Sequence, residues 1–261
     1  MHRGHYNGPA LTLAVRIGLV LAAAGLLWAA FFPGWGWLVF PALFLGFLGL
    51  NQAGPKRGLG LGFLWGAVFF LLEFSVLRSL APFIGPMAYG VIVLMAVYGG
   101  IFFGAFGLLA GWRGALGVLA GGWTLLEIAR GTGPVGFTFG AVPPALAGTP
   151  FVAAAALAGP WLLSLAVALT AASLVNGLRH PKFLGLALLG PLLLWGLGAL
   201  VPQTKLRGET RLALVQPDIP QADRLDRTKL PEILSRYERL LAQAPNDVDL
   251  IVILENATPA F

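Results

Sequence analysis

Glu255 stands where a carboxylate often does chemistry. It follows directly on the apolar run 248–254, at the carboxyl end of what we expect to be a buried strand. Open α/β sheets build their sites at such ends, and partial removal from water is a usual way to tune a carboxylate as a general base. The alternative is a structural glutamate that caps a turn.

Two further carboxylates occur beside arginines near the ends of long apolar runs. Glu127 and Arg130, three residues apart, share a helix face, and Glu73 and Arg78 are five apart. Ionisable groups in a membrane are costly and are functional candidates by default. The alternative for both pairs is an ion pair that fixes helix register.

The composition defines the setting of these residues. The chain has 261 residues, 57% of them hydrophobic, with a mean hydropathy of +0.82, which excludes an ordinary soluble domain. Residues 1–201 carry nine Lys/Arg and two Asp/Glu, whereas the last sixty carry eight and nine. We therefore interpret the net charge of +6 as membrane topology and anionic-lipid contact, with no nucleic-acid partner.

The chain contains no cysteine, which excludes disulfides, thiolate metal sites and a cysteine nucleophile within these residues. The three histidines are scattered, so we expect no metal site and no cofactor.

We expect an α-helical polytopic membrane bundle of about seven helices over residues 1–203. The apolar runs long enough to approach a bilayer core of roughly 30 Å are 11–32, 34–50, 59–80, 84–110, 114–130, 150–176 and 183–201. Glycines such as those in Gly58–Gly62 suit close helix packing rather than a phosphate loop.

The basic residues predict the orientation of the bundle. With a cytoplasmic N-terminus, the inner side carries Arg3, Lys56, Arg57, Arg113, Arg179 and Lys182, and the outer side has little beyond Arg78 and Arg130. This asymmetry fits the positive-inside rule. Seven spans would place the tail on the outer, periplasmic face. If two runs formed one re-entrant element, the tail would lie inside, with a poorer fit to the charges.

The tail, residues 204–261, is expected to begin an incomplete α/β domain. Residues 211–216 and 248–254 are predicted strands, and 230–241 is a predicted amphipathic helix. A strand–helix–strand unit makes the two strands parallel. The second run is continuously apolar, as in strands buried on both faces. Either further chain or the membrane part would cover the open sheet.

Three short stretches, in this order, resemble apolipoprotein N-acyltransferase, a bacterial membrane enzyme family with a nitrilase-like domain. They are the E-x-x-R-G at 127–131, the VQ-x-x-IPQ at 215–221 and the E-x-A-x-P at 255–259. The resemblance implies an α-β-β-α sandwich (carbon-nitrogen hydrolase fold) for the tail and a location in the bacterial inner membrane.

The resemblance also implies a two-step acyl transfer. An acyl chain passes from a membrane phospholipid to a cysteine thioester, and then to the N-terminal amine of diacylglyceryl-cysteine in an apolipoprotein acceptor. Glu255 would be the general base, and a lysine would stabilise the oxyanion. The lysine and cysteine would lie beyond Phe261, so we expect a C-terminally truncated chain that is inactive alone.

A lipid-binding site is expected at the outer end of the bundle. The candidate residues for binding acyl chains and a phosphate are Phe137, Phe139, Glu127 and Arg130. Phe151 and Trp161 are expected at the same outer end. The alternative is an ordinary interfacial aromatic belt. For the whole chain the alternatives are a non-catalytic membrane anchor that binds lipid or a partner, and a small transporter. The transporter fits least, because the ionisable residues lie near span ends.

Overall fold

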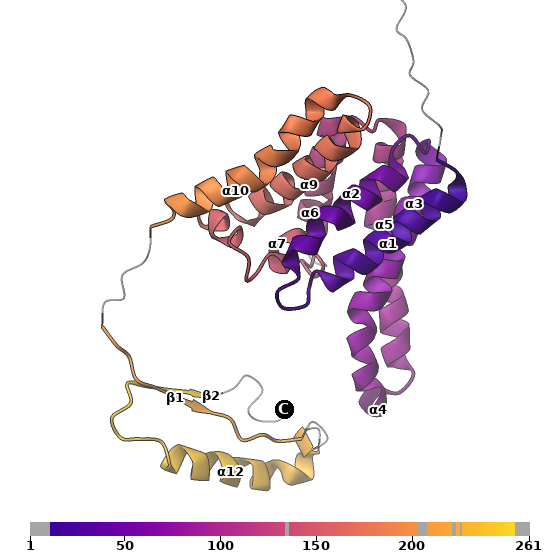
Figure 1. The fold of residues 1–261 in the computed structure, drawn as a ribbon. Coiled ribbons are helices and arrows are strands. Elements are labelled where there is room, and N and C mark those ends of the chain that lie inside the picture. Colours follow the sequence, from indigo (N-terminus) through magenta and orange to yellow (C-terminus); the bar gives the residue numbers. More distant parts are fainter. Residues whose placement is uncertain (1–10, 134–135, 203–207, 221–222, 225, 254–261) are drawn as a thin grey trace, which may run out of the picture. The chain divides into compact units, whose positions relative to one another are not determined.

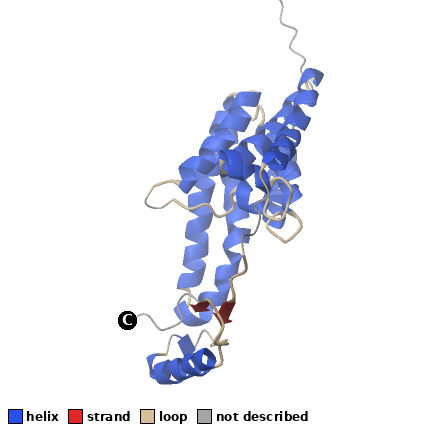
Figure 2. Cartoon of the chain, turned by 90° about the vertical axis from the view of Figure 1, so that its left-hand side faces the viewer, coloured by secondary structure: helices blue, strands red, loops and turns tan. Residues whose placement is uncertain are grey.

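A computed structural model describes residues 11–133, 136–202, 208–220, 223–224 and 226–253. The chain divides into two compact units, Met1–Pro202 and Gln203–Phe261. Helix makes up most of the described chain, and the one described sheet is small (Figure 2).

The first unit is a helical bundle (Figure 1). Its α-helices are α1 (Leu13–Ala29), α2 (Val39–Leu50), α3 (Pro55–Glu73), α4 (Ala81–Ile84), α5 (Met87–Trp112), α6 (Leu116–Gly131), α7 (Val142–Ala145), α8 (Ala155–Ala158), α9 (Pro160–Gly177) and α10 (Leu189–Leu200). Short 3₁₀ segments are η1 (Gly36–Leu38), η2 (Phe74–Leu80), η3 (Val152–Ala154) and η4 (Pro181–Leu188).

Each of the seven predicted runs contains helix, but the described part of the chain has four stretches long and apolar enough to cross a membrane. They are Pro55–Ile84, Met87–Trp112, Pro160–Gly177 and Pro181–Leu200. Leu13–Ala29 and Gly36–Leu50 are shorter apolar helices. The run 150–176 forms one continuous helix only from Pro160, because Gly159 has a φ of 77° and a proline follows it.

The ends of six helices gather at one end of the bundle, where α1, α3 and α6 begin and α2, α5 and α9 end. We call this the basic end, since it carries Arg16, Lys56, Arg57, Arg113, Arg179 and Lys182. Hydrogen bonds join its segments: Arg16 Nη1 to Gly49 O and to Asn51 O (both 2.8 Å), Gly54 N to Gly111 O (3.1 Å) and Asn176 Nδ2 to Gly114 O (3.5 Å).

Helices α3 and α5 lie side by side with their backbones in contact (Figure 1). A Cβ added at Gly58 would lie 2.2 Å from Gly107 O, and one at Gly107 would lie 2.2 Å from Gly58 O. The interpretation as packing residues is confirmed for Gly58 and Gly62, because a side chain at either position would clash with α5. It is wrong for Gly60, where an added Cβ meets nothing within 4 Å. Deeper in the core, Trp65 stacks on Trp123 at a centroid distance of 5.2 Å.

The second unit contains β1 (Leu212–Val215), η5 (Arg227–Lys229), α12 (Leu230–Ala242) and β2 (Leu250–Ile253). The two strands are parallel, with Leu212 opposite Leu250 and Val215 opposite Ile253, so the predicted strand–helix–strand unit is confirmed. Its small core consists of Val215, Ile219, Ile233 and Tyr237.

The prediction that the second strand is buried on both faces is wrong for the described residues. The four residues of β2 are between 39% and 53% exposed. A single helix with two strands cannot cover both faces of a sheet, so an apolar strand remains open to solvent within this unit.

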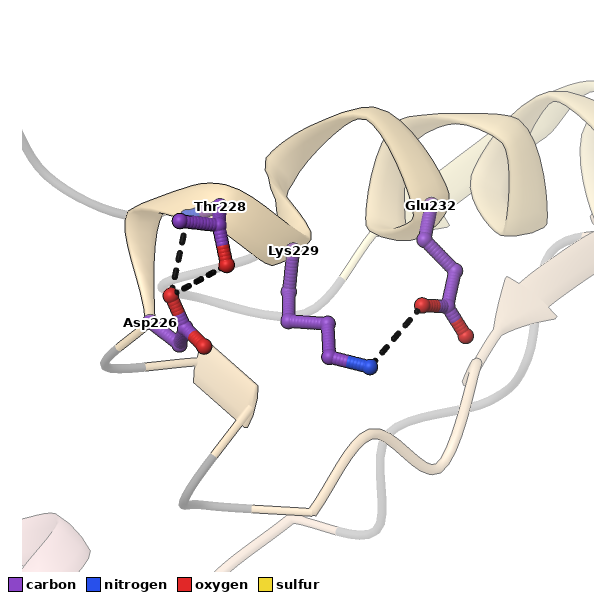
Figure 3. A network of polar contacts seen from close by, with 4 residues as sticks. All are labelled: Asp226, Thr228, Lys229 and Glu232. Atoms are coloured by element: carbon purple, nitrogen blue, oxygen red, sulfur yellow. Dashed lines mark hydrogen bonds and ion pairs between the residues drawn. The ribbon is translucent and has the colours of Figure 1, made fainter.

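A local network fixes the entry to α12 (Figure 3). Asp226 Oδ1 accepts hydrogen bonds from Thr228 N at 2.9 Å and Thr228 Oγ1 at 2.7 Å. Lys229 Nζ lies 3.3 Å from Glu232 Oε2. The Thr228 hydroxyl, followed by its backbone N–H, lowers the pKa of Asp226, and the hydrogen bond to Glu232 raises the pKa of Lys229.

Candidate functional site

Glu127 and Arg130 lie in the last turns of α6, away from the basic end, and each is 1% exposed. Their spacing predicted an ion pair as one alternative, and the structure contradicts it. Among the described residues, the ion pairs are Arg211–Asp247 and Lys229–Glu232, both in the second unit.

Both side chains instead hold the segment that follows α6. This α6–α7 loop spans residues 132–141, of which 134–135 are not described. Glu127 Oε1 accepts a hydrogen bond from Val142 N at 2.9 Å, and Arg130 Nη1 donates to Phe139 O. Phe137 N donates to Arg130 O at 2.9 Å. The second half of the loop and the start of α7 are therefore hydrogen-bonded back to the end of α6.

The loop also packs closely on α3. Gly140 has a φ of 69°, and a Cβ at this position would lie 2.4 Å from Phe69 Cε1. A side chain would therefore be strained by the backbone conformation and would also clash. The last loop residue, Ala141, is 1% exposed, which shows that this part of the loop is built into the bundle.

An aromatic cluster connects the loop to the neighbouring helices. We define it as Phe70, Phe74, Tyr98, Phe137 and Phe139. The ring of Phe137 lies 6.0 Å from Phe70, 6.0 Å from Phe74 and 5.3 Å from Tyr98, and that of Phe139 lies 5.9 Å from Phe74. Phe139 is 62% exposed and Phe137 is partly buried, so the cluster reaches the surface of the bundle.

Arg130 lies behind this cluster rather than at the surface. Its guanidinium carbon is 5.2 Å from the ring centroid of Phe70 and 5.5 Å from that of Phe137. A cation over two ring faces is attracted to both. With 1% of its surface exposed, Arg130 braces the rings and the loop from inside.

Glu127 is surrounded by polar side chains that are buried with it. Trp123 and Ser164 interact with its carboxylate. Neither reaches full hydrogen-bond geometry: Glu127 Oε2, Ser164 Oγ and Trp123 Nε1 are all buried without a hydrogen-bond partner among the described residues. Unsatisfied buried groups of this kind are costly.

Of the other sequence candidates, Trp161 lies near this site and Phe151, Glu73 and Arg78 make other contacts. The ring contact described for Phe151 is with Phe40 of α2, at 5.8 Å. Trp161 lies against the end of α6, where its Cη2 would be 3.3 Å from a Cβ at Gly131. Glu73 and Arg78 form no ion pair among the described contacts, and Arg78 Nε donates to Ser75 O at 3.0 Å.

Glu255 lies outside the described residues, two positions after the end of β2 at Ile253. Sequence reasoning missed Phe70, Phe74 and Tyr98. The i, i+4 spacing of Phe70 and Phe74 was an available signal, because residues four apart meet on one helix face.

The first unit is a bundle of apolar helices in which two buried polar side chains hold an aromatic loop. The second unit is a small α/β unit with two parallel strands. This combination is that of an integral membrane protein with a separate polar unit. The family model described as the apolipoprotein N-acyltransferase N-terminal domain matches residues 23–173. This match covers more than half of the chain, and the chain therefore belongs to that family.

Two curated relatives are similar to this protein over most of the chain. The apolipoprotein N-acyltransferase of Chromobacterium violaceum is 28% identical over 279 aligned residues, covering 98% of this chain and 53% of the relative. That of Azotobacter vinelandii is 32% identical over 271 residues, covering 92% of this chain and 51% of the relative. The chain spans about half the length of these relatives.

Proposed function

We propose that this protein takes part in moving an acyl chain from a membrane phospholipid, through a cysteine thioester, to the N-terminal amine of diacylglyceryl-cysteine in apolipoproteins. The observation that carries the proposal is the family match over residues 23–173, which includes Glu127, Arg130 and the aromatic cluster. The proposed setting is the bacterial inner membrane, with the N-terminus cytoplasmic and the second unit periplasmic, as the start of a nitrilase-like domain.

In this proposal the aromatic cluster contacts the acyl chain of the donor phospholipid. Phe139, which is 62% exposed, and the partly buried Phe137 offer ring faces next to lipid. Glu127 and Arg130 act on the lipid through the loop that they hold, because both are buried and hydrogen-bonded to its backbone or to its boundary. Glu255 would be the general base of the transfer step.

The thioester requires a thiol from outside these 261 residues, because they contain no cysteine. We therefore propose that this chain alone binds the donor lipid without turning it over. A second candidate function is a non-catalytic membrane module that binds lipid or a partner.

Membranes from cells with and without this gene test the proposal. They are supplied with a diacylglyceryl-cysteine peptide and a phospholipid that carries an alkyne on its acyl chain, and the labelled peptide is measured by mass spectrometry. Loss of the N-acylated peptide without the gene supports acyl transfer. Unchanged N-acylation contradicts it and favours the non-catalytic module.

A pair of gene variants then tests the role of the general base. Glu255→Gln keeps the shape of the side chain but removes the base, so N-acylation should fall to nearly the level of the gene deletion. Glu209→Gln, an exposed glutamate in the same unit, is the matched control and should leave N-acylation unchanged. Equal activity of both variants would contradict the assigned base.

A further inference from the structure

Within the described part of the first unit, the cations of the basic end have no acidic partner. In residues 1–202 the acidic residues are Glu73 and Glu127. Glu73 closes α3 whereas Arg57 lies in its first turn, and sixteen residues of helix separate them by about 24 Å. Glu127 lies near the far end of α6 and is bonded to Val142.

Arg16 is the buried centre of this end of the bundle. It is 7% exposed, and its Nε and Nη1 donate to Leu11 O, Gly49 O and Asn51 O at 3.2, 2.8 and 2.8 Å. Its Nη2 makes no hydrogen bond with any described residue. Arg57 and Arg179 lie close enough to Arg16 for their positive charges to repel it.

Arg57 and Arg179 are both exposed, and neither side chain has a hydrogen bond or ion pair with a described residue. They come from different segments: Arg57 from the start of α3, and Arg179 from the turn after α9. The hydrogen bonds Gly54 N to Gly111 O and Asn176 Nδ2 to Gly114 O connect these two segments through the α5–α6 turn. The backbone segments that carry Arg57 and Arg179 are thus connected by hydrogen bonds.

Aromatic rings mark this end as a membrane interface. Arg113 lies 4.9 Å from the ring centroid of Trp112, which is 64% exposed, and Lys182 lies 5.3 Å from that of Phe183. Tryptophan is enriched where acyl chains meet headgroups. Exposed cations beside such rings are suited to the headgroup level of a bilayer.

We propose that Arg57 and Arg179, backed by Arg16, bind the phosphate group of an anionic phospholipid headgroup at the basic end. Guanidinium groups match phosphate oxygens with paired hydrogen bonds, and a bound anion would offset the repulsion that Arg57 and Arg179 exert on Arg16. This site is separate from the α6–α7 loop, and it does not depend on the proposed acyl transfer.

To test the proposal, the full chain is purified from vesicles that contain both phosphatidylglycerol and phosphatidylcholine. Native mass spectrometry then identifies the lipid that the protein retains. The wild-type protein should retain phosphatidylglycerol in preference to phosphatidylcholine. In the double variant Arg57→Gln/Arg179→Gln, the ratio of retained phosphatidylglycerol to phosphatidylcholine should fall about tenfold, because each cation near a headgroup contributes separately to the binding of anionic lipid. An unchanged preference would overturn the proposal.

Matched variants separate a site from net charge. Arg236→Gln/Arg239→Gln removes two positive charges from the exposed face of α12 and should keep the preference; an equal loss would overturn the proposal. Arg57→Lys/Arg179→Lys keeps both charges and should retain most of the preference for phosphatidylglycerol. A loss as large as that of the glutamine double variant, with native-like thermal unfolding, would contradict a site that binds through these charges.

Inorganic phosphate distinguishes the two sources of a phosphate group. Phosphate is added to the wild-type protein during lipid exchange, at matched ionic strength against chloride. Retention of phosphatidylglycerol supports a lipid site. Displacement by phosphate but not by chloride supports the phosphate group itself as the ligand, and equal displacement by both salts overturns a specific site.

Discussion

Glu127 Oε1 accepts a hydrogen bond from the backbone N–H of Val142, 2.9 Å away and fifteen residues further along the chain. This bond ties the start of α7 back to α6 and closes the α6–α7 loop. Because both residues are at most 1% exposed, the bond lies where water cannot replace it. The exposed ring of Phe139 is thereby presented on a fixed backbone.

Replacing the acceptor should loosen this loop. Glu127→Met keeps the approximate volume but leaves the buried N–H of Val142 unpaired, which should cost about 1–3 kcal/mol of unfolding free energy. Glu127→Gln retains an acceptor oxygen and should cost clearly less. Hydrogen exchange of residues 136–142 in lipid nanodiscs measures the difference. Equal exchange in both variants would refute the role of this bond.

Arg130→Lys tests the contribution of the planar guanidinium. The lysine keeps the charge but cannot lie over Phe70 and Phe137 in the same way. We therefore expect the free energy of unfolding to fall by about 0.5–2 kcal/mol. Thermal unfolding measures it. Arg113→Lys is the matched control, because Arg113 lies over Trp112 at an exposed position and its replacement should have little effect. A larger loss for Arg113→Lys would contradict the bracing role.

The contact between α3 and α5 predicts opposite effects for two neighbouring glycines. Gly58→Ala places a Cβ against Gly107 O and should destabilise the bundle by about 1–3 kcal/mol. Gly60→Ala meets nothing within 4 Å and should be neutral or stabilising, by up to about 1 kcal/mol of helix propensity. Chemical unfolding in mixed micelles compares the two. A similar loss for both would argue against the close contact.

The entry to α12 should be sensitive to acid. Because the hydrogen bonds from Thr228 lower the pKa of Asp226 in the folded state, their stabilisation is present above the unfolded pKa and is lost as the pH falls through the folded pKa. Thr228→Val should raise the pKa of Asp226 toward its ordinary value, as measured by carboxyl NMR titration.

Glu232→Gln is the control for that titration. It removes the ion-pair partner of Lys229 and should lower the pKa of Lys229 toward its ordinary value, while the hydrogen bonds to Asp226 remain. A rise of the Asp226 pKa in Glu232→Gln as large as in Thr228→Val would show that Thr228 is not the principal cause.

The sequence predicted the elements of this protein better than their contacts. The helices in all seven apolar runs could be predicted because hydropathy depends only on local composition. The parallel pairing of β1 with β2 follows from the helix between them. The exposure of β2 was not predictable from its own apolar residues. It depends on how much of the sheet other elements cover.

The contacts at the end of α6 show the same limit. The three-residue spacing of Glu127 and Arg130 places them on one helix face, but it does not say which partner each side chain takes. Arg130 bonds to the backbone oxygen of Phe139, and Glu127 bonds to the backbone N–H of Val142. Nothing in the sequence marks these two positions as partners. Family motifs drew attention to these residues, whereas the structure shows that they hold the α6–α7 loop.

The most direct test is the photolabelling of the full chain by a phospholipid that carries a diazirine on its acyl chain, with the labelled residues mapped by mass spectrometry. We predict labelling at residues 136–139, reduced in Phe137→Leu/Phe139→Leu and retained in Phe151→Leu, whose ring packs on Phe40 instead. Absence of label from residues 136–139, or equal labelling of all three proteins there, would contradict the aromatic cluster as the contact site of the donor lipid.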